Sequence, residues 1–194
     1  MKTEIDRNHD ALIVVDMQND FCPGGSLAVN EGDQIIPTIN RLIRLFNHVI
    51  FTRDWHPPDH ISFSNAPRFV DKSWPKHCVA DTPGAQLHPD LRIPKTALII
   101  NKGTHKNKEA YSGFQGTDLA EELKKGGVTR IFVCGLATDY CVKNTALDAV
   151  EAGFQTVVIE DAVRGVDIPQ GSAIAAIEEM RRKGVQFVSS DELF

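Results

Sequence analysis

One stretch predicts the architecture of this chain: Arg130-Ile-Phe-Val-Cys-Gly-Leu-Ala-Thr-Asp-Tyr-Cys141-Val. It reads as an apolar strand that ends at Gly135 and turns tightly into a helix, with Cys141 at the helix start. The N–H groups at a helix N-terminus favour a thiolate and can hold an oxyanion. The ordinary alternative is a buried cysteine that packs a helix against a sheet. Other strand ends in the chain favour a reactive thiol.

Short apolar runs alternate with amphipathic stretches along the chain. The predicted strands are residues 11–15, 49–52, 97–101, 130–134, 156–159 and 185–188, and the predicted helices are residues 34–46, 117–125, 139–152 and 170–183. This alternation is typical of buried parallel strands joined by helices. It predicts an α/β fold of three layers, a doubly wound parallel sheet with helices on both faces. A site in such a fold lies beyond the carboxyl ends of the strands.

The length predicts one domain over residues 1–194. Residues 55–95 break the strand and helix rhythm and are rich in Pro, His, Asp and Ser. Long irregular segments inside compact domains are usually functional or disordered. The two tryptophans of this segment, Trp55 and Trp74, favour an ordered loop, because disordered segments contain few aromatic residues.

Composition limits the function classes. The net charge of −5 comes without a basic block, which disfavours nucleic acid as a partner and favours a small uncharged substrate. No apolar run approaches the roughly 20 residues of a membrane span. The polar start over residues 1–10 predicts no secretory signal, so a cytoplasmic location is expected. Four cysteines without a CxxC pair are expected to be reduced thiols.

Polar residues follow four predicted strands where a site would lie. They are Asp16, Asp54, Lys102 and Cys141. A single Asp after a strand is usually a loop cap, but four convergent strand ends favour a site. Asp16, Lys102 and Cys141 form a nucleophile with two tuning charges: the carboxylate takes the thiol proton and later protonates a leaving amine, while the ammonium depresses the thiol pKa. This set predicts amide hydrolysis through a thioester, with the N–H groups of Ala137 and Cys141 as the oxyanion hole.

A second constellation lies in the irregular segment. Asp54 and His56, with His60 and His77 further along, resemble a site in which a carboxylate and two imidazoles hold a metal with open positions. Solvated loop histidines are the competing interpretation. The Pro57-Pro58 pair favours a rigid loop and therefore a preformed site.

Three aromatic residues are candidates to close the pocket: Phe21, Trp74 and Tyr111. A planar ring would stack among them.

Several motifs, taken together, resemble one known family. They are Asp16-Met-Gln-Asn-Asp-Phe21, Thr52-Arg-Asp54-Trp-His56-Pro-Pro-Asp-His60, Trp74-Pro-Lys-His77-Cys-Val, Lys102-Gly103, Tyr111-Ser-Gly-Phe114 and Gly135-Leu-Ala-Thr-Asp-Tyr-Cys141-Val. The chain resembles the nicotinamidases, or pyrazinamidases, of the isochorismatase-like cysteine hydrolase superfamily. The match spans nearly the whole chain.

The resemblance carries specific expectations. It implies a six-stranded sheet of order 3-2-1-4-5-6, a triad of Asp16, Lys102 and Cys141, and a cis Leu136–Ala137 peptide. It also implies one divalent metal ion, Zn2+ or Fe2+ with Mn2+ as an alternative. The expected ligands are Asp54, His56 and His77, with His60 as a candidate fourth ligand, and the expected substrate-binding residues are Phe21, Trp74 and Tyr111.

The resemblance also implies a function. The chain is expected to be an amidohydrolase that converts nicotinamide to nicotinate and ammonia in NAD salvage, with pyrazinamide as a further substrate. An amidase of the same superfamily acting on a carbamoyl or ureido compound is the nearest alternative. Isochorismatase is a weaker one, because Cys141 counts against it. A non-enzymatic doubly wound module is disfavoured, because no Gly-rich phosphate loop follows the first strand. The oligomeric state stays open, and a homo-oligomer is compatible with the sequence.

Overall fold

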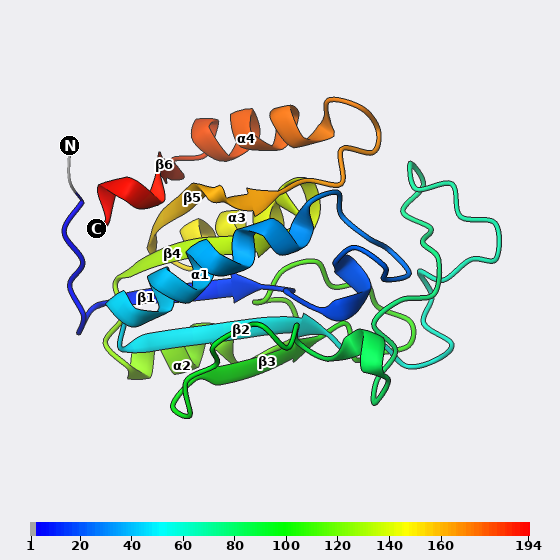
Figure 1. Ribbon diagram of the computed structural model, residues 1–194, viewed down its shortest axis with the longest axis horizontal. Helices are drawn as coiled ribbons and strands as arrows, with labels where there is room; N and C mark the ends of the chain where they lie inside the picture. The colour runs from blue at the N-terminus through cyan, green and yellow to red at the C-terminus, as the bar shows by residue number, and fades with distance from the viewer. Residues whose placement is uncertain (1–2) are drawn as a thin grey trace.

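The computed structural model describes residues 3–194, so Met1 and Lys2 of the polar start lie outside the described residues. Six parallel strands form one sheet in the order β3-β2-β1-β4-β5-β6 (Figure 1). The strands are β1 (Asp10–Val15), β2 (His48–Asp54), β3 (Leu98–Lys102), β4 (Arg130–Leu136), β5 (Gln155–Arg164) and β6 (Gln186–Val188). The predicted fold class and strand order are confirmed.

Helices cover both faces of the sheet. The helices are α1 (Ile36–Leu42), α2 (Leu119–Lys125), α3 (Lys143–Glu151) and α4 (Ser172–Arg182). In β1, Leu12 and Val14 pack in the core beneath α1, while Ile13 packs in the opposite core beneath α2, α3 and α4. Successive strand residues point to opposite faces, so an all-apolar strand feeds both cores. No helix in residues 3–194 is long and apolar enough to cross a bilayer.

The junction between β4 and α3 differs from the predicted helix over residues 139–152. A π-helical turn occupies Thr138–Val142, and α3 begins only at Lys143. The N–H of Val142 donates to the carbonyl oxygen of Ala137 at 3.1 Å, a five-residue spacing that widens the backbone. Cys141 therefore lies in the wide turn before the α-helix.

The neighbouring ends of β1 and β4 require a glycine. Gly135 has a φ of 113°, and a Cβ at this position would lie 2.1 Å from the carbonyl oxygen of Val15. The pairing of β4 with β5 shifts register between Val133 and Gly135. Asp16, the residue after Val15, has a φ of 48°, so the backbone is also left-handed there. The central strands thus end in irregular backbone at the edge where the predicted site lies.

The segment between β2 and β3 is irregular, as predicted. Within it the structure has a 3-10 turn over Pro83–Ala85 and isolated bridges between His56 and Val79 and between Phe63 and Trp74. It extends from the carboxyl edge of the sheet, at the right of Figure 1. This places its histidines beside the strand ends.

Candidate active site

Lys102, the last residue of β3, lies at the centre of the site. Its side chain is buried, and Nζ makes three hydrogen bonds: 2.5 Å to Asp54 Oδ1, 3.3 Å to Cys141 Sγ and 3.3 Å to the carbonyl oxygen of Ala110. An ammonium has three N–H donors, and a fourth acceptor, Asp16 Oδ2, lies 2.8 Å from the same nitrogen. The structure therefore brings the predicted Lys102 and Cys141 into direct contact.

Asp16 completes this group from the end of β1. Its carboxylate is fully buried, and its Oδ2 lies 2.8 Å from Lys102 Nζ in an ion pair. Oδ1 accepts a hydrogen bond from Thr52 Oγ1 at 2.7 Å. Oδ2 is the one buried side-chain nitrogen or oxygen in residues 3–194 that has no hydrogen bond. A carboxylate oxygen of Asp16 also lies within 4.8 Å of Cys141 Sγ, so Asp16 can accept a proton from the thiol.

The Lys102 ammonium lowers the pKa of the Cys141 thiol, as predicted, but burial has the larger effect. Burial raises the pKa of the Cys141 thiol well above its usual range, and Lys102 opposes this effect only in part. Burial likewise raises the pKa of Asp16, although the Lys102 ammonium lowers it. Burial lowers the pKa of the Lys102 ammonium, but the Asp16 and Asp54 carboxylates have a larger effect and raise it overall. Burial and the two neighbouring carboxylates therefore favour the protonated thiol of Cys141.

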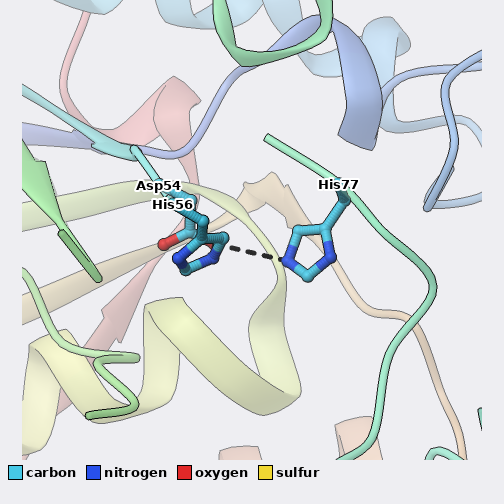
Figure 2. Close-up of side chains that lie close together, drawn as sticks. All are labelled: Asp54, His56 and His77. Carbon is cyan, nitrogen blue, oxygen red and sulfur yellow. Dashed lines mark ion pairs between the residues drawn. The ribbon is translucent and has the colours of Figure 1, made fainter. Parts of the chain in front are cut away.

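Three predicted metal ligands meet beside this group. Asp54 Oδ2 lies 3.4 Å from His56 Nε2 and 3.9 Å from His77 Nε2, and all three side chains are buried (Figure 2). Burial lowers the pKa of His77 to about 4, so this imidazole is neutral at pH 7. Burial opposes protonation of His56, but the Asp54 carboxylate outweighs it and raises the pKa.

The opposite nitrogen of each ring is held by a carbonyl group. His56 Nδ1 lies 2.9 Å from the carbonyl oxygen of Gly103, and His77 Nδ1 lies 2.7 Å from that of Pro75. A carbonyl oxygen only accepts, so each Nδ1 is the donor and each Nε2 is directed at Asp54. Ligating histidines are typically oriented in this way. The three donor atoms lie within 4.8 Å of one another, so the residues fit a divalent metal ion.

His60 does not join this cluster. Its ring stacks near His56 with centroids 4.2 Å apart, but both ring nitrogens are engaged elsewhere. Nδ1 lies 2.8 Å from Ser62 Oγ, and Nε2 lies 3.0 Å from the carbonyl oxygen of Lys108. Both ring nitrogens of His60 therefore have partners outside the cluster.

Two residues that sequence reasoning left without a role support the cluster. The side chain of Gln18 accepts from the N–H of Asp54 at 2.8 Å and donates to its carbonyl oxygen at 2.7 Å. Asp20 accepts from the N–H of Cys78 at 2.7 Å and so holds the residue after His77. Both lie in the Asp16–Phe21 motif, whose density of polar residues after a buried strand was the available signal.

An apolar pocket opens above Cys141 and the cluster. The space inside it, including the open mouth, is about 440 Å3. It is lined by the predicted aromatic residues Phe21, Trp74 and Tyr111, and also by Leu27, Asp54, His56, His77, Glu109, Ala137, Tyr140, Cys141 and Val166. Sequence reasoning missed Tyr140, whose ring meets that of Trp74 edge-on with centroids 4.9 Å apart. Trp74 Nε1 in turn donates to the Tyr111 hydroxyl at 3.0 Å.

The predicted oxyanion turn also lines the pocket. The Leu136–Ala137 peptide is cis, as expected. Within residues 3–194 the N–H of Ala137 makes no hydrogen bond. The assignment of Ala137 and Cys141 as oxyanion donors stays a prediction.

The fold and the site define a class, the cysteine hydrolases built on a doubly wound parallel sheet, with a buried cysteine in the turn after a central strand. The chain belongs to the isochorismatase family, because the Isochorismatase domain matches residues 10–192. Within this family it is similar to the nicotinamidase of Acinetobacter baylyi, with 45% identity over 94% of each chain.

Two solved structures show the same similarity. The pyrazinamidase of Pyrococcus horikoshii in complex with zinc is 49% identical, with a TM-score of 0.85 over 93% of this chain and 99% of that one. PnC1 from L. infantum in complex with nicotinate is 36% identical, with a TM-score of 0.90 over 100% of this chain and 99% of that one.

Proposed function

We propose that this chain hydrolyses nicotinamide to nicotinate and ammonia through a Cys141 thioester, and that pyrazinamide is a further substrate. The observation that carries the proposal is the 3.3 Å contact between Cys141 Sγ and Lys102 Nζ beneath an apolar pocket. The similarity to nicotinamidases over nearly the whole chain supports this substrate class.

In the first half of the reaction Cys141 acts on the amide. Its S–H proton passes to Asp16 Oδ2 as Sγ bonds to the amide carbon, and the carbonyl π electrons move to oxygen. The N–H groups of Ala137 and Cys141 would hold that oxyanion. When the oxyanion collapses, the carbon–nitrogen bond breaks, and Asp16 returns its proton to the nitrogen. Ammonia leaves, and the acyl group remains on Sγ.

Water completes the cycle. It gives a proton to Asp16 and attacks the thioester carbon, the carbon–sulfur bond breaks, and Asp16 reprotonates Sγ. Lys102 stays an ammonium throughout, because the pKa of its buried amine is raised by two carboxylates. Its fixed charge offsets the negative charge that Asp16 and Asp54 bring to the site.

The metal ion would be held by Asp54, His56 and His77. We propose Zn2+ or Fe2+, because one carboxylate and two imidazoles suit either ion, and Mn2+ is the alternative. A bound ion would act as a Lewis acid toward a pyridine nitrogen or water. Phe21, Trp74 and Tyr111 would then flank the substrate ring.

We further propose that residues 1–194 act as one hydrolase domain in the cytoplasm, with a small-molecule substrate as partner. The net charge of −5 without a basic block supports a neutral substrate over nucleic acid.

Ammonia release from nicotinamide tests the proposal. We expect Cys141→Ala to abolish it and Cys134→Ala, the matched loss of a buried thiol within β4, to retain it. Undiminished turnover by Cys141→Ala would exclude the thioester. A panel with carbamoyl and ureido compounds, run before and after chelation, tests the substrate class.

A further inference from the structure

Thr52 places a buried hydroxyl next to the proposed base. It lies in β2, pairs with Val15 of β1 and is fully buried. Its Oγ1 donates to Asp16 Oδ1 at 2.7 Å, across 36 residues of sequence. Nothing in the reaction described above uses this group.

The hydrogen bonds around Asp16 make its two oxygens unequal. Oδ1 is held by Thr52, whereas Oδ2 has no hydrogen bond, although Lys102 Nζ lies only 2.8 Å away. Lys102 Nζ pairs with Oδ2, but the same ammonium also contacts Asp54, Ala110 and Cys141, so it is shared among several acceptors. Because Thr52 occupies Oδ1, Oδ2 is the oxygen with lone pairs left to accept a proton, and the Asp16 carboxylate lies within 4.8 Å of Cys141 Sγ.

We propose that Thr52 is a positioning residue for proton transfer. By donating to Oδ1, its hydroxyl fixes the rotation of the Asp16 carboxylate and reserves Oδ2 as the atom that receives the Cys141 proton. This inference rests on the proposed function. A purely structural role, in which Thr52 only satisfies a buried carboxylate, would affect the stability of the protein and leave catalysis intact.

Four variants separate these roles. Thr52→Val keeps the shape and removes the hydroxyl, whereas Thr52→Ser keeps the hydroxyl. Thr52→Ala, compared with Thr52→Ser, isolates the hydroxyl if the valine variant fails to fold. Thr156→Val is the control, because Thr156 is a buried threonine of β5 whose hydroxyl donates to the Phe154 carbonyl oxygen.

We expect Thr52→Val to lower kcat for nicotinamide about 10- to 100-fold, a part of the roughly 100- to 10,000-fold that general acid–base catalysis supplies. KM, and Kd for nicotinate by calorimetry, should stay within about twofold, since the pocket lining is unchanged. Alkylation of Cys141 by iodoacetamide should slow in parallel, because it too needs the proton removed. The kcat of Thr52→Ser should stay within about threefold of the parent value, and that of Thr156→Val within about twofold.

The inference is overturned if Thr52→Val keeps kcat within twofold of the parent, or if Thr52→Ser falls as far as Thr52→Val or Thr52→Ala. Cys141→Ala assayed in parallel keeps the two hypotheses apart. If Cys141→Ala is inactive while Thr52→Val is fully active, only the role of Thr52 fails. If Cys141→Ala is active, the proposed function itself fails.

Discussion

Asp54 Oδ1 lies 2.5 Å from Lys102 Nζ, while the other oxygen of the same carboxylate faces His56 and His77. One side chain therefore belongs to both the cysteine group and the proposed metal site. Burial works against ionisation of this carboxyl, but Lys102 and His56 outweigh it and hold its pKa below the usual range. A substitution of Asp54 should accordingly affect both the cysteine group and the proposed metal site.

Because Asp54 belongs to both groups, substitutions of Asp54 and Asp16 should cause different losses of metal and activity. We expect Asp54→Asn to lose bound metal as well as ammonia release, because both depend on its charge. Asp16→Asn should lose ammonia release by at least about 100-fold through loss of the proposed base, yet keep its metal. Metal content by mass spectrometry, measured with activity on the same samples, checks both. Equal metal content in the two variants would contradict the dual role of Asp54.

The environments of His77 and His60 predict that only the first substitution by alanine greatly weakens metal binding. We expect His77→Ala to reduce metal affinity by more than the roughly 10- to 100-fold that loss of an outer hydrogen-bond partner costs. His60→Ala should retain the metal, because its ring nitrogens contact Ser62 and Lys108. Titration of the metal-free proteins with Zn2+ gives both affinities. If His60→Ala weakened metal binding by more than the loss of an outer hydrogen-bond partner does, His60 would be a ligand.

Gly103 allows His56 to approach the backbone. A Cβ there would lie 2.4 Å from His56 Cε1, and the φ of 62° already disfavours other residues. We expect Gly103→Ala to weaken both metal binding and ammonia release. Gly116→Ala is the matched control, since Gly116 has a φ of 69° but no neighbour near its missing Cβ. In both variants the left-handed backbone should lower the free energy of unfolding, measured in urea, by about 1 kcal/mol. Only Gly103→Ala should lose bound metal.

The buried Cys22 thiol predicts a loss of stability in alkaline solution. Burial, followed by the nearby Asp33, raises its pKa to about 11. In the unfolded chain a thiol ionises near pH 8.5, so between about pH 8.5 and 11 the unfolded state binds fewer protons than the folded state. The free energy of unfolding must then fall as pH rises, by at most about 1.4 kcal/mol per pH unit.

Urea unfolding at several pH values, with the parent and Cys22→Ala compared, measures this contribution. The variant should lose less stability between pH 8.5 and 10.5 than the parent does, whatever its stability at pH 7. Parallel curves for the two proteins would show that Cys22 ionises alike in the folded and unfolded states.

Much of the site was predictable because strand ends are marked locally. Asp16, Asp54 and Lys102 each close an apolar run, and parallel strands present their carboxyl ends at one edge. The aromatic residues of the pocket followed from motifs in the loops. Tyr140 was missed because its role depends on contact with Trp74, which lies far away in the sequence.

The amino-acid pattern by itself determined the sheet, its layers and the residues that meet at its carboxyl edge, because these depend on periodicity and on the handedness of βαβ connections. Only the tertiary structure decided which atoms pair there. It placed Lys102 Nζ against Asp54, Ala110, Cys141 and Asp16 Oδ2, and it placed Thr52 against Asp16 Oδ1. It also showed that burial outweighs the lowering effect of Lys102 on the pKa of Cys141, because desolvation and the summed field of neighbouring charges exist only once distant strands are packed together.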